Sequence, residues 1–260
     1  MEDTSQVKTI DRLASVLDCF TAEHTTWSLA ELSARLNLPK STLHRFLVGL
    51  EVHGILRRDP HDKKWRLGYH LFLWGSLAAE STGLRHIARP VLHELAGQTG
   101  ETTLLTVYHN HEVICTDKVE TTHHVRLSLE VGDRRMCHAG ASSKALMAFL
   151  PEAEIDAIIR EKGLPRLCTN TITQPEALKA ALAQIRERGY AVSLEETDPG
   201  AWGVAAPIRG WSGDVVGAVG VAGPTLRYDQ AKQQAYAGFC REAARKVSAL
   251  LSTSSNFPLS

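Results

Sequence analysis

Residues 28–67 read SLAELSARLNLPKSTLHRFLVGLEVHGILRRDPHDKKWRL, a run with the marks of two helices followed by a hairpin. Ser28 and Glu31 have the spacing of a capping box, in which each side chain accepts a hydrogen bond from the other residue's backbone N–H. A helix is therefore predicted to begin here and to end near Asn37. Pro39 suits the start of a further helix, whose buried stripe is formed by apolar residues at helical spacing: Leu43, Phe46, Leu47 and Leu50.

A two-stranded hairpin is predicted at the end of this stretch. Two strand-like runs, residues 55–58 and 63–67, flank the turn sequence Asp59-Pro60-His61-Asp62. Residues 7–20 carry apolar side chains at helical spacing, which predicts another helix before the capping box. Three helices and a hairpin make a winged helix-turn-helix domain, predicted over residues 6–68.

Charge is unevenly distributed along the chain. Lys and Arg number 29, as do Asp and Glu, so the formal net charge is zero and a wholly basic surface is excluded. Residues 34–66, however, hold eight basic and three acidic residues, a net charge of +5 that leaves −5 for the rest of the chain. Such asymmetry favours a partner rich in phosphate for this part alone.

Double-stranded DNA is the partner that fits a winged helix-turn-helix, because a helix enters the major groove and the hairpin contacts the flanking backbone. Base contacts are assigned to Ser41, Thr42, His44 and Arg45, and phosphate contacts to the hairpin cations. The alternatives are a charged, solvated surface or a protein-interaction module. The full set of expected DNA-binding residues is Ser28, Lys40, Ser41, Thr42, His44, Arg45, Arg57, Arg58, Lys63, Lys64 and Arg66.

A linker helix is predicted over residues 69–82. Residues 69–79 are apolar on almost every side, which favours packing against another subunit over packing in an intramolecular core.

Residues 83–254 are predicted to form an α+β domain. The expected strands are residues 102–108, 112–119, 125–131, 190–195, 203–208 and 215–221, and the expected helices are residues 84–97, 139–150, 151–162, 174–188 and 229–251.

Composition and cysteine usage narrow the class of protein. Hydrophobic residues make up 43% and charged residues 22% of 260, as in folded globular proteins, and a length of 260 favours two domains. The chain has no apolar run near the roughly 18 residues of a membrane span and no signal-peptide core, so a cytosolic location is expected. Five dispersed cysteines without a C-x-x-C pair indicate reduced thiols. No cofactor is expected.

Two kinds of chemistry compete with a binding function. Ser142, Ser143 and Lys144 follow His138, but the spacing is not S-x-x-K and the chain has no G-x-S-x-G, so an enzyme is disfavoured. A metal site is a second alternative, weighed against histidines that are solvent-facing or hydrogen-bonded. Its candidate ligands are His109, His111, His123, His124, His138 and Cys137.

Beyond these patterns, the chain resembles the isocitrate lyase regulator (IclR) family of bacterial transcription factors over almost its whole length. Residues 138–146, HAGASSKAL, resemble that family's H-A-x-A-x-G-K-A-L element, with Ser143 where the family usually has Gly. Other matching segments are Leu29-Ala30-Glu31-Leu32, Lys40-Ser41-Thr42-Leu43-His44-Arg45, Gly189-Tyr190, Glu195-Glu196, Val204-Ala205-Ala206-Pro207-Ile208, Gly213 and Gly223-Pro224.

The resemblance implies a homodimer or a dimer of dimers, a GAF-like effector domain and control of a nearby catabolic operon, by repression or activation. It also implies an effector pocket between the sheet and the helix of the H-A-x-A element, where helix N-terminal amides suit a carboxylate. By position, the pocket residues are His124, Leu127, Ala141, Ser142, Ser193, Ala201, Gly203, Gly220 and Ala222.

Several of these residues depart from those of the family members that bind small acids. Such members resemble one another in offering Asp, Cys and two Ser, whereas this chain has Ser193, Gly203, Gly220 and Ala222. The hypothesis is a bulkier effector, such as an aromatic or branched carboxylate, with its charge on the amides of Ala141 and Ser142. Arg126, Arg134 and Arg135 are expected to flank the mouth, either to pair an acidic ligand or as surface salt bridges.

The sequence therefore predicts a ligand-responsive transcriptional regulator, with the linker helix as the transmitter between effector and DNA. Two alternatives remain: a constitutive DNA-binding protein whose second domain only dimerises, and an enzyme that uses that domain.

Overall fold

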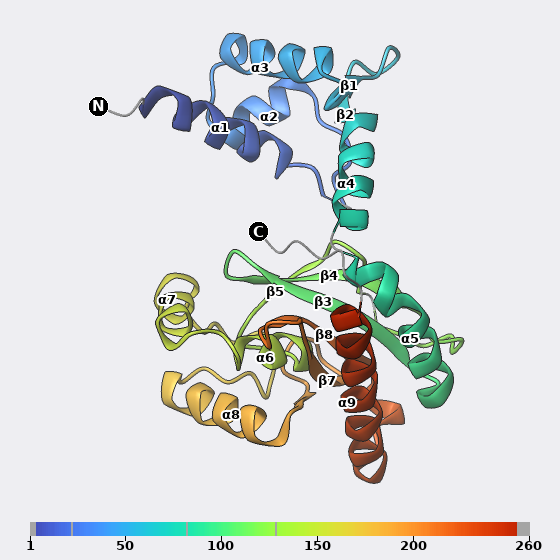
Figure 1. The fold of residues 1–260 in the computed structure, drawn as a ribbon. Helices are drawn as coiled ribbons and strands as arrows, with labels where there is room; N and C mark the ends of the chain where they lie inside the picture. Colours follow the sequence, from blue (N-terminus) through green and yellow to red (C-terminus); the bar gives the residue numbers. More distant parts are fainter. Residues whose placement is uncertain (1–3, 22, 82, 128, 254–260) are drawn as a thin grey trace. The chain divides into compact units, whose positions relative to one another are not determined.

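The computed structural model describes residues 4–21, 23–81, 83–127 and 129–253 (Figure 1). The chain divides after Ser81 into two compact units, residues 1–81 and residues 82–260. In the described ranges, no helix combines the length and hydrophobicity that crossing a membrane requires.

The first unit is a winged helix-turn-helix, as predicted. Its core consists of side chains with almost no contact with solvent: Val16, Leu32, Leu43, Leu47, Leu50, Leu56 and Trp65. The elements are α1 (Thr4–Leu17), α2 (Leu29–Leu36), α3 (Lys40–Val52), β1 (Leu56–Arg58), β2 (Trp65–Leu67) and α4 (Tyr69–Ser81). Helix α1 starts and ends three residues before the predicted bounds of residues 7–20.

Local sequence explains where α2 begins and ends. Ser28 Oγ accepts from the Glu31 N–H at 3.3 Å, and Glu31 Oε2 accepts from the Ser28 N–H at 2.7 Å, so the capping box is confirmed. The same backbone hydrogen bond lowers the pKa of Glu31. Asn37 adopts a left-handed conformation (φ 51°) and ends the helix, a role for which asparagine is suited.

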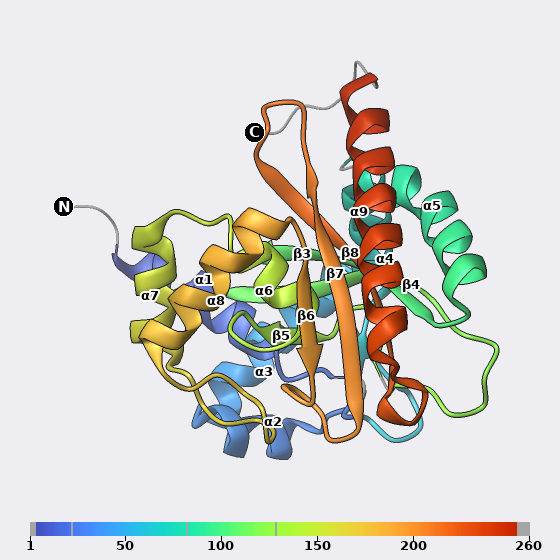
Figure 2. The same ribbon diagram turned by 90° about the horizontal axis from the view of Figure 1, so that it is seen from below.

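The second unit is one six-stranded antiparallel sheet with helices on both faces (Figure 2). The strand order is β5-β4-β3-β8-β7-β6. The strands are β3 (Thr102–His109), β4 (Glu112–Val119), β5 (Arg134–Met136), β6 (Ala191–Leu194), β7 (Ala201–Arg209) and β8 (Val215–Pro224).

Each face of the sheet has its own hydrophobic core. One core is shared with α5 (Leu84–Thr99) and α9 (Gln230–Thr253). The other is shared with α6 (Ala141–Met147), α7 (Glu152–Lys162) and α8 (Pro175–Arg188). The α+β class is confirmed, and a short 3₁₀ turn, Thr225–Arg227, joins β8 to α9.

One predicted strand, residues 125–131, is wrong. Apart from Ser128, which lies outside the described residues, this segment is a loop in which Val125 and Val131 are exposed. The backbone of β4 at Cys115 pairs instead with Gly132 and Asp133, and β5 follows directly. β-branched composition alone therefore suggested a strand, whereas β4 takes its edge partners from residues 132–136.

Strand β4 contains a β-bulge. Thr106 pairs with Cys115 and Leu105 with Asp117, so Thr116 is an extra residue in the ladder. Val113 belongs to the core beneath α6, whereas the carboxylate of Asp117 contacts Arg85 and Arg89 of α5, on the other face.

Gly68 occupies a position that admits no side chain. A Cβ there would lie 2.1 Å from the carbonyl oxygen of Gly54, a backbone atom that cannot move aside cheaply. We expect Gly68→Ala to destabilise the first unit by about 1–3 kcal/mol or more, because the backbone must shift.

Gly49 is the matched control, since a Cβ on this exposed helical residue meets no atom within 4 Å. Gly49→Ala should stabilise the unit by up to about 1 kcal/mol, through helix propensity. Hydrogen exchange of the α3 backbone amides in both variants measures the two effects, and equal protection in them would contradict the clash.

Candidate functional sites

The face of α3 opposite its buried leucines carries the residues predicted to contact bases. Ser41, His44 and Arg45 are exposed, as is Lys40 in the first turn, and Thr42 is half-buried. Short polar and cationic side chains near the start of an exposed helix are suited to hydrogen bonds with base edges. Contact with DNA by these residues stays a prediction.

The cationic side chains of the hairpin differ in their exposure to solvent and in their partners. Arg57, Arg58 and Lys63 are exposed and Lys64 is half-buried. Arg66 is paired with both acids of the hairpin tip, Asp59 at 3.3 Å and Asp62 at 2.9 Å. Arg66 is therefore held to the turn. Arg58 is also engaged, because its Nε donates to the Lys63 carbonyl at 3.1 Å and its guanidinium lies 5.8 Å from the centre of the Trp65 ring. Contact of the hairpin cations with phosphate stays a prediction.

Ser28 has a structural role that is independent of DNA. Its hydroxyl and its backbone N–H both take part in the capping box of α2, and the residue is half-buried. Contact of Ser28 with DNA stays a prediction.

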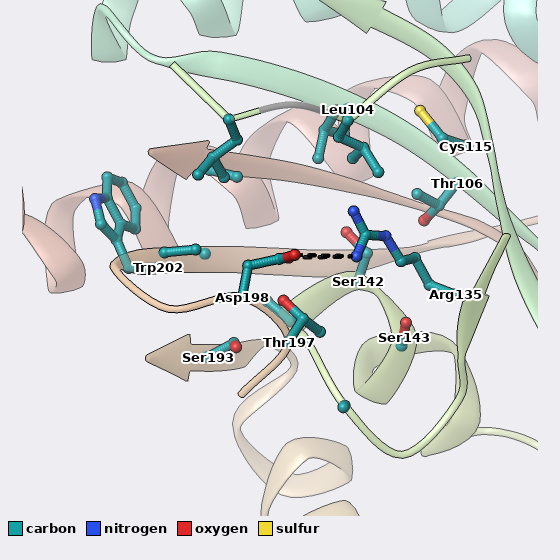
Figure 3. A pocket seen from close by; sticks show the side chains of 18 of the residues that line it. Leu104, Thr106, Cys115, Arg135, Ser142, Ser143, Ser193, Thr197, Asp198 and Trp202 are labelled. Atoms are coloured by element: carbon teal, nitrogen blue, oxygen red, sulfur yellow. Dashed lines mark hydrogen bonds and ion pairs between the residues drawn. The ribbon is translucent and has the colours of Figure 1, made fainter. Parts of the chain in front are cut away.

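The second unit contains a cavity of about 300 Å³ beside the start of α6 (Figure 3). Strands β3, β4, β7 and β8 provide its apolar wall, which includes Leu104, Val113, Trp202 and Val221. Hydroxyl side chains of Thr106, Ser142, Ser193 and Thr197 also line it. A concave, mainly apolar site with a few convergent polar groups is typical of a small-molecule pocket.

Most of the predicted effector residues lie in this cavity. Its lining includes Leu127, Ala141, Ser142, Ser193, Ala201, Gly203 and Ala222.

Two predicted pocket residues, His124 and Gly220, are not part of the lining. His124 is exposed and directly precedes the segment that was predicted as a strand. Gly220 lies behind Ser142, because a Cβ on it would be 3.0 Å from the Ser142 hydroxyl oxygen.

Sequence reasoning missed the wall that β3 and β4 provide. Leu104 and Thr106 alternate on one face of β3, a period-2 signal that was present in the sequence. Cys115, predicted only to be one of five reduced thiols, also lines the cavity. Arg126 and Arg135 line the cavity, whereas Arg134 is directed to Glu112 at 3.4 Å.

A buried ion pair fixes the start of α6. Lys144 Nζ pairs with Glu196 Oε1, and the two side chains are 5% and 9% exposed. Lys144 also donates to the carbonyl of Val192 at 3.0 Å, and Glu196 Oε2 accepts from the Gly140 N–H at 3.1 Å. Burial lowers the pKa of Lys144, and the negative charge of Glu196 partly offsets this. The pair thereby ties α6 to β6.

Comparison with known proteins identifies the family. Residues 76–249 match the family described as "Bacterial transcriptional regulator IclR C-terminal", and residues 9–60 match the "IclR helix-turn-helix domain". The chain belongs to the IclR family. These matches cover both units of the fold.

Three relatives illustrate the similarity. The regulator BhcR of Paracoccus denitrificans is 36% identical, over 95% of this chain and 88% of its own. The transcriptional repressor IclR of Escherichia coli is 31% identical, over 94% and 90%. An IclR homologue from Microbacterium hydrocarbonoxydans, solved in complex with 4-hydroxybenzoate, has a TM-score of 0.83 and 29% identity, over 94% and 99%.

As its IclR-family relatives are transcriptional regulators, the protein is a regulator rather than an enzyme. In the structure, His138 Nε2 contacts the carbonyl oxygen of Pro165 at 3.0 Å.

His109 and His111, two of the candidate metal ligands, contact neighbouring side chains of the protein. His111 lies between Glu154 and Glu161, at 3.3 and 3.1 Å, and His109 is hydrogen-bonded to Asn110. Over the described ranges, no three or more His, Cys, Asp or Glu side chains gather as a metal site.

All five cysteines of this IclR-family protein are free thiols, and four are buried. Burial raises the pKa of Cys115 to about 11 and those of Cys137 and Cys240 to about 12, so these thiols are protonated at neutral pH.

His138 makes the stability of the second unit sensitive to acid. Burial lowers the pKa of this imidazole, which has a value of about 6.5 in an unfolded chain. Below about pH 6.5 the unfolded chain therefore binds more protons, and stability is lost as the pH falls toward the folded-state pKa. We expect His138→Asn to remove this loss, whose slope is at most about 1.4 kcal/mol per pH unit.

Urea-dependent hydrogen exchange of the β7 amides from pH 5 to 7.5 measures this effect as the difference between wild type and variant. His93→Asn, on the exposed face of α5, is the control and should leave the slope unchanged. A His138→Asn profile parallel to that of wild type would refute the assignment.

Proposed function

We propose that this protein is an effector-responsive regulator that binds operator DNA through α3 and the hairpin and binds a small organic acid in the cavity beside α6. The observation that supports the effector function is the cavity itself, an apolar chamber of about 300 Å³ with two arginines, Arg126 and Arg135, in its lining. A relative of known structure holds 4-hydroxybenzoate, an acid of suitable size.

An aromatic or branched carboxylate suits this cavity better than a two- or three-carbon acid. The lining has glycine or alanine at Ala201, Gly203 and Ala222, which leaves room, and Leu104 and Trp202 offer apolar surface to a ring. Burial of such a ring contributes free energy roughly in proportion to its apolar area.

In the proposed organisation, residues 6–68 bind DNA, residues 69–82 link the two parts, and residues 83–254 bind effector. Dimerisation, as a homodimer or a dimer of dimers, would cover exposed apolar side chains of α4 such as Tyr69, Phe72 and Trp74. The protein would act in the cytoplasm on a catabolic operon. Two recognition helices in a dimer match two half-sites of a pseudo-palindrome.

Effector must favour one arrangement of the dimer to alter DNA binding. A coupling free energy of about 1–3 kcal/mol would change operator affinity roughly 5- to 150-fold.

The two classes of DNA contact should be separable by mutation. Arg45→Ala removes a predicted base contact and should cost about 1–3 kcal/mol on operator DNA, with relaxed specificity at one position. Lys64→Ala removes a phosphate contact, so all sequences should bind more weakly and the salt slope should fall by about one. Binding titrations over a salt series, with specific and random duplexes, measure both. Wild-type binding by Arg45→Ala at every salt concentration would contradict its assignment.

An effector screen tests the second half of the proposal. A ligand at about 100 times its dissociation constant adds roughly 2.7 kcal/mol of stability, which a thermal-shift assay detects. We expect aromatic or branched carboxylates to raise the melting temperature and to change affinity for the DNA upstream of the protein's own gene. Tight binding of glyoxylate or pyruvate instead would reject the bulky-effector hypothesis, and DNA binding that no acid alters would favour a constitutive regulator.

A further inference from the structure

The cavity contains an ion pair of its own. Arg126 and Arg135 are the cations among its described lining residues, and Asp198 is the acid. Arg135 stands on β5 and Asp198 in the loop between β6 and β7, and the two side chains meet from opposite walls (Figure 3). An effector that carries an acid group therefore meets a receptor that already holds a carboxylate.

The contact between Arg135 and Asp198 is loose. A single guanidinium nitrogen, Nη1, reaches both carboxylate oxygens, at 3.5 and 3.3 Å. The two side chains are 34% and 50% exposed. Arginine binds carboxylates best through two parallel N–H···O bonds, and this pair lacks that arrangement. A ligand carboxylate that approaches the guanidinium edge-on would therefore bind Arg135 better than Asp198 does.

Asp198 can leave without a movement of the loop. The backbone on either side is anchored, because Glu195 N–H donates to the Ala201 carbonyl at 2.7 Å and Thr225 N–H donates to the Gly200 carbonyl at 2.7 Å. The Glu195 carboxylate also accepts from the Gly200 N–H at 2.9 Å. Rotation of one half-exposed side chain is then sufficient to free Arg135.

The other charged groups near the cavity are less suited to receive an acid. Glu196 already accepts from the Gly140 N–H at the start of the seven-residue helix α6, and Lys144 is committed to Glu196. Arg126 makes a similarly loose contact with Glu120 at 3.4 Å, but its side chain is 48% exposed against 34% for Arg135, and Glu120 is not part of the cavity lining. Arg135 is therefore the less solvated of the two cations, and its partner, Asp198, stands inside the cavity.

We propose that Asp198 occupies the place of the effector's carboxylate on Arg135, and that an entering acid displaces it. This inference rests on the proposed function, since it assigns the recognition of the acid group to a residue pair in that cavity. Displacement of Asp198 makes the pocket selective for acids. A neutral molecule of the same shape makes no charge-assisted contact with Arg135, so nothing compensates for the loss of the contact between Arg135 and Asp198.

The test uses the full-length protein with two probes of equal shape, 4-hydroxybenzoate and its neutral counterpart 4-hydroxybenzamide, in calorimetric titrations. Asp198→Asn removes the competing charge and should tighten 4-hydroxybenzoate binding about two- to fivefold, the range for a partly exposed ion pair. Arg135→Gln should weaken it at least tenfold, and Arg135→Lys should restore part of the loss. The affinity for 4-hydroxybenzamide should change less than twofold in all three variants.

Two further variants separate displacement from a structural effect. In Arg135→Gln, the additional change Asp198→Asn should no longer tighten binding, because the aspartate acts through the arginine. Arg134→Gln is the matched control: it removes the same charge from the neighbouring residue, which pairs with Glu112 outside the cavity lining, and should bind both probes like wild type.

The outcomes are distinct. If 4-hydroxybenzoate binds wild type while Asp198→Asn and Arg135→Gln leave its affinity unchanged, the acid is held elsewhere, for example on the amides of Ala141 and Ser142, and the inference is overturned while the proposed function stands. A second outcome is that neither wild type nor Asp198→Asn, which lacks the competing carboxylate, binds 4-hydroxybenzoate at millimolar concentration. This result would also overturn the inference. Failure of every acid in the wider screen would, separately, reject the proposed function.

Discussion

The buried ion pair between Lys144 and Glu196 is the constraint on which the ligand side of the second unit depends. It joins residues 52 positions apart in the sequence. Lys144 also donates to Val192 of β6, and Glu196, in the loop after β6, accepts from the N-cap residue Gly140 of α6. The free energy needed to desolvate two such buried charges is large, and their mutual attraction offsets it only roughly. The contribution of the pair is therefore mainly geometric: the first turn of α6 has one position relative to the sheet.

That position determines the shape of the cavity. Gly140, held by Glu196, has φ 92°, a conformation that L-residues with a side chain rarely adopt. From there Ala141 and Ser142 face the walls contributed by β7 and β8. The contrast with Arg135 and Asp198 is informative. One ion pair is buried and serves the architecture, whereas the other is half-exposed and exchangeable, although Glu196 and Asp198 are only two residues apart.

Features set by local periodicity were predictable from the sequence, whereas features set by long-range pairing were not. The capping box at Ser28, the apolar stripe of α3 and the hairpin depend on residues a few positions apart, and each was placed correctly. The prediction of a strand at residues 125–131 was wrong because strand formation depends on a partner that no local pattern reveals. The same holds for the pocket. The motif around Ala141 and Ser142 marks one wall, but the assignment of Arg135 to the cavity and of Arg134 to Glu112 depends on the register of β5 against β4.

The bulge in β4 places two nearby residues in different surroundings. Cys115 lines the cavity, and Asp117 contacts Arg85 and Arg89 in the first turns of α5, the helix that follows α4 in the chain. In an uninterrupted strand, residues two positions apart share a face. The extra residue, Thr116, therefore shifts the alternation of the strand, so that Cys115 faces the cavity while the carboxylate of Asp117 faces α5. One strand thus contributes to the ligand cavity at one end and to the packing of α5 at the other.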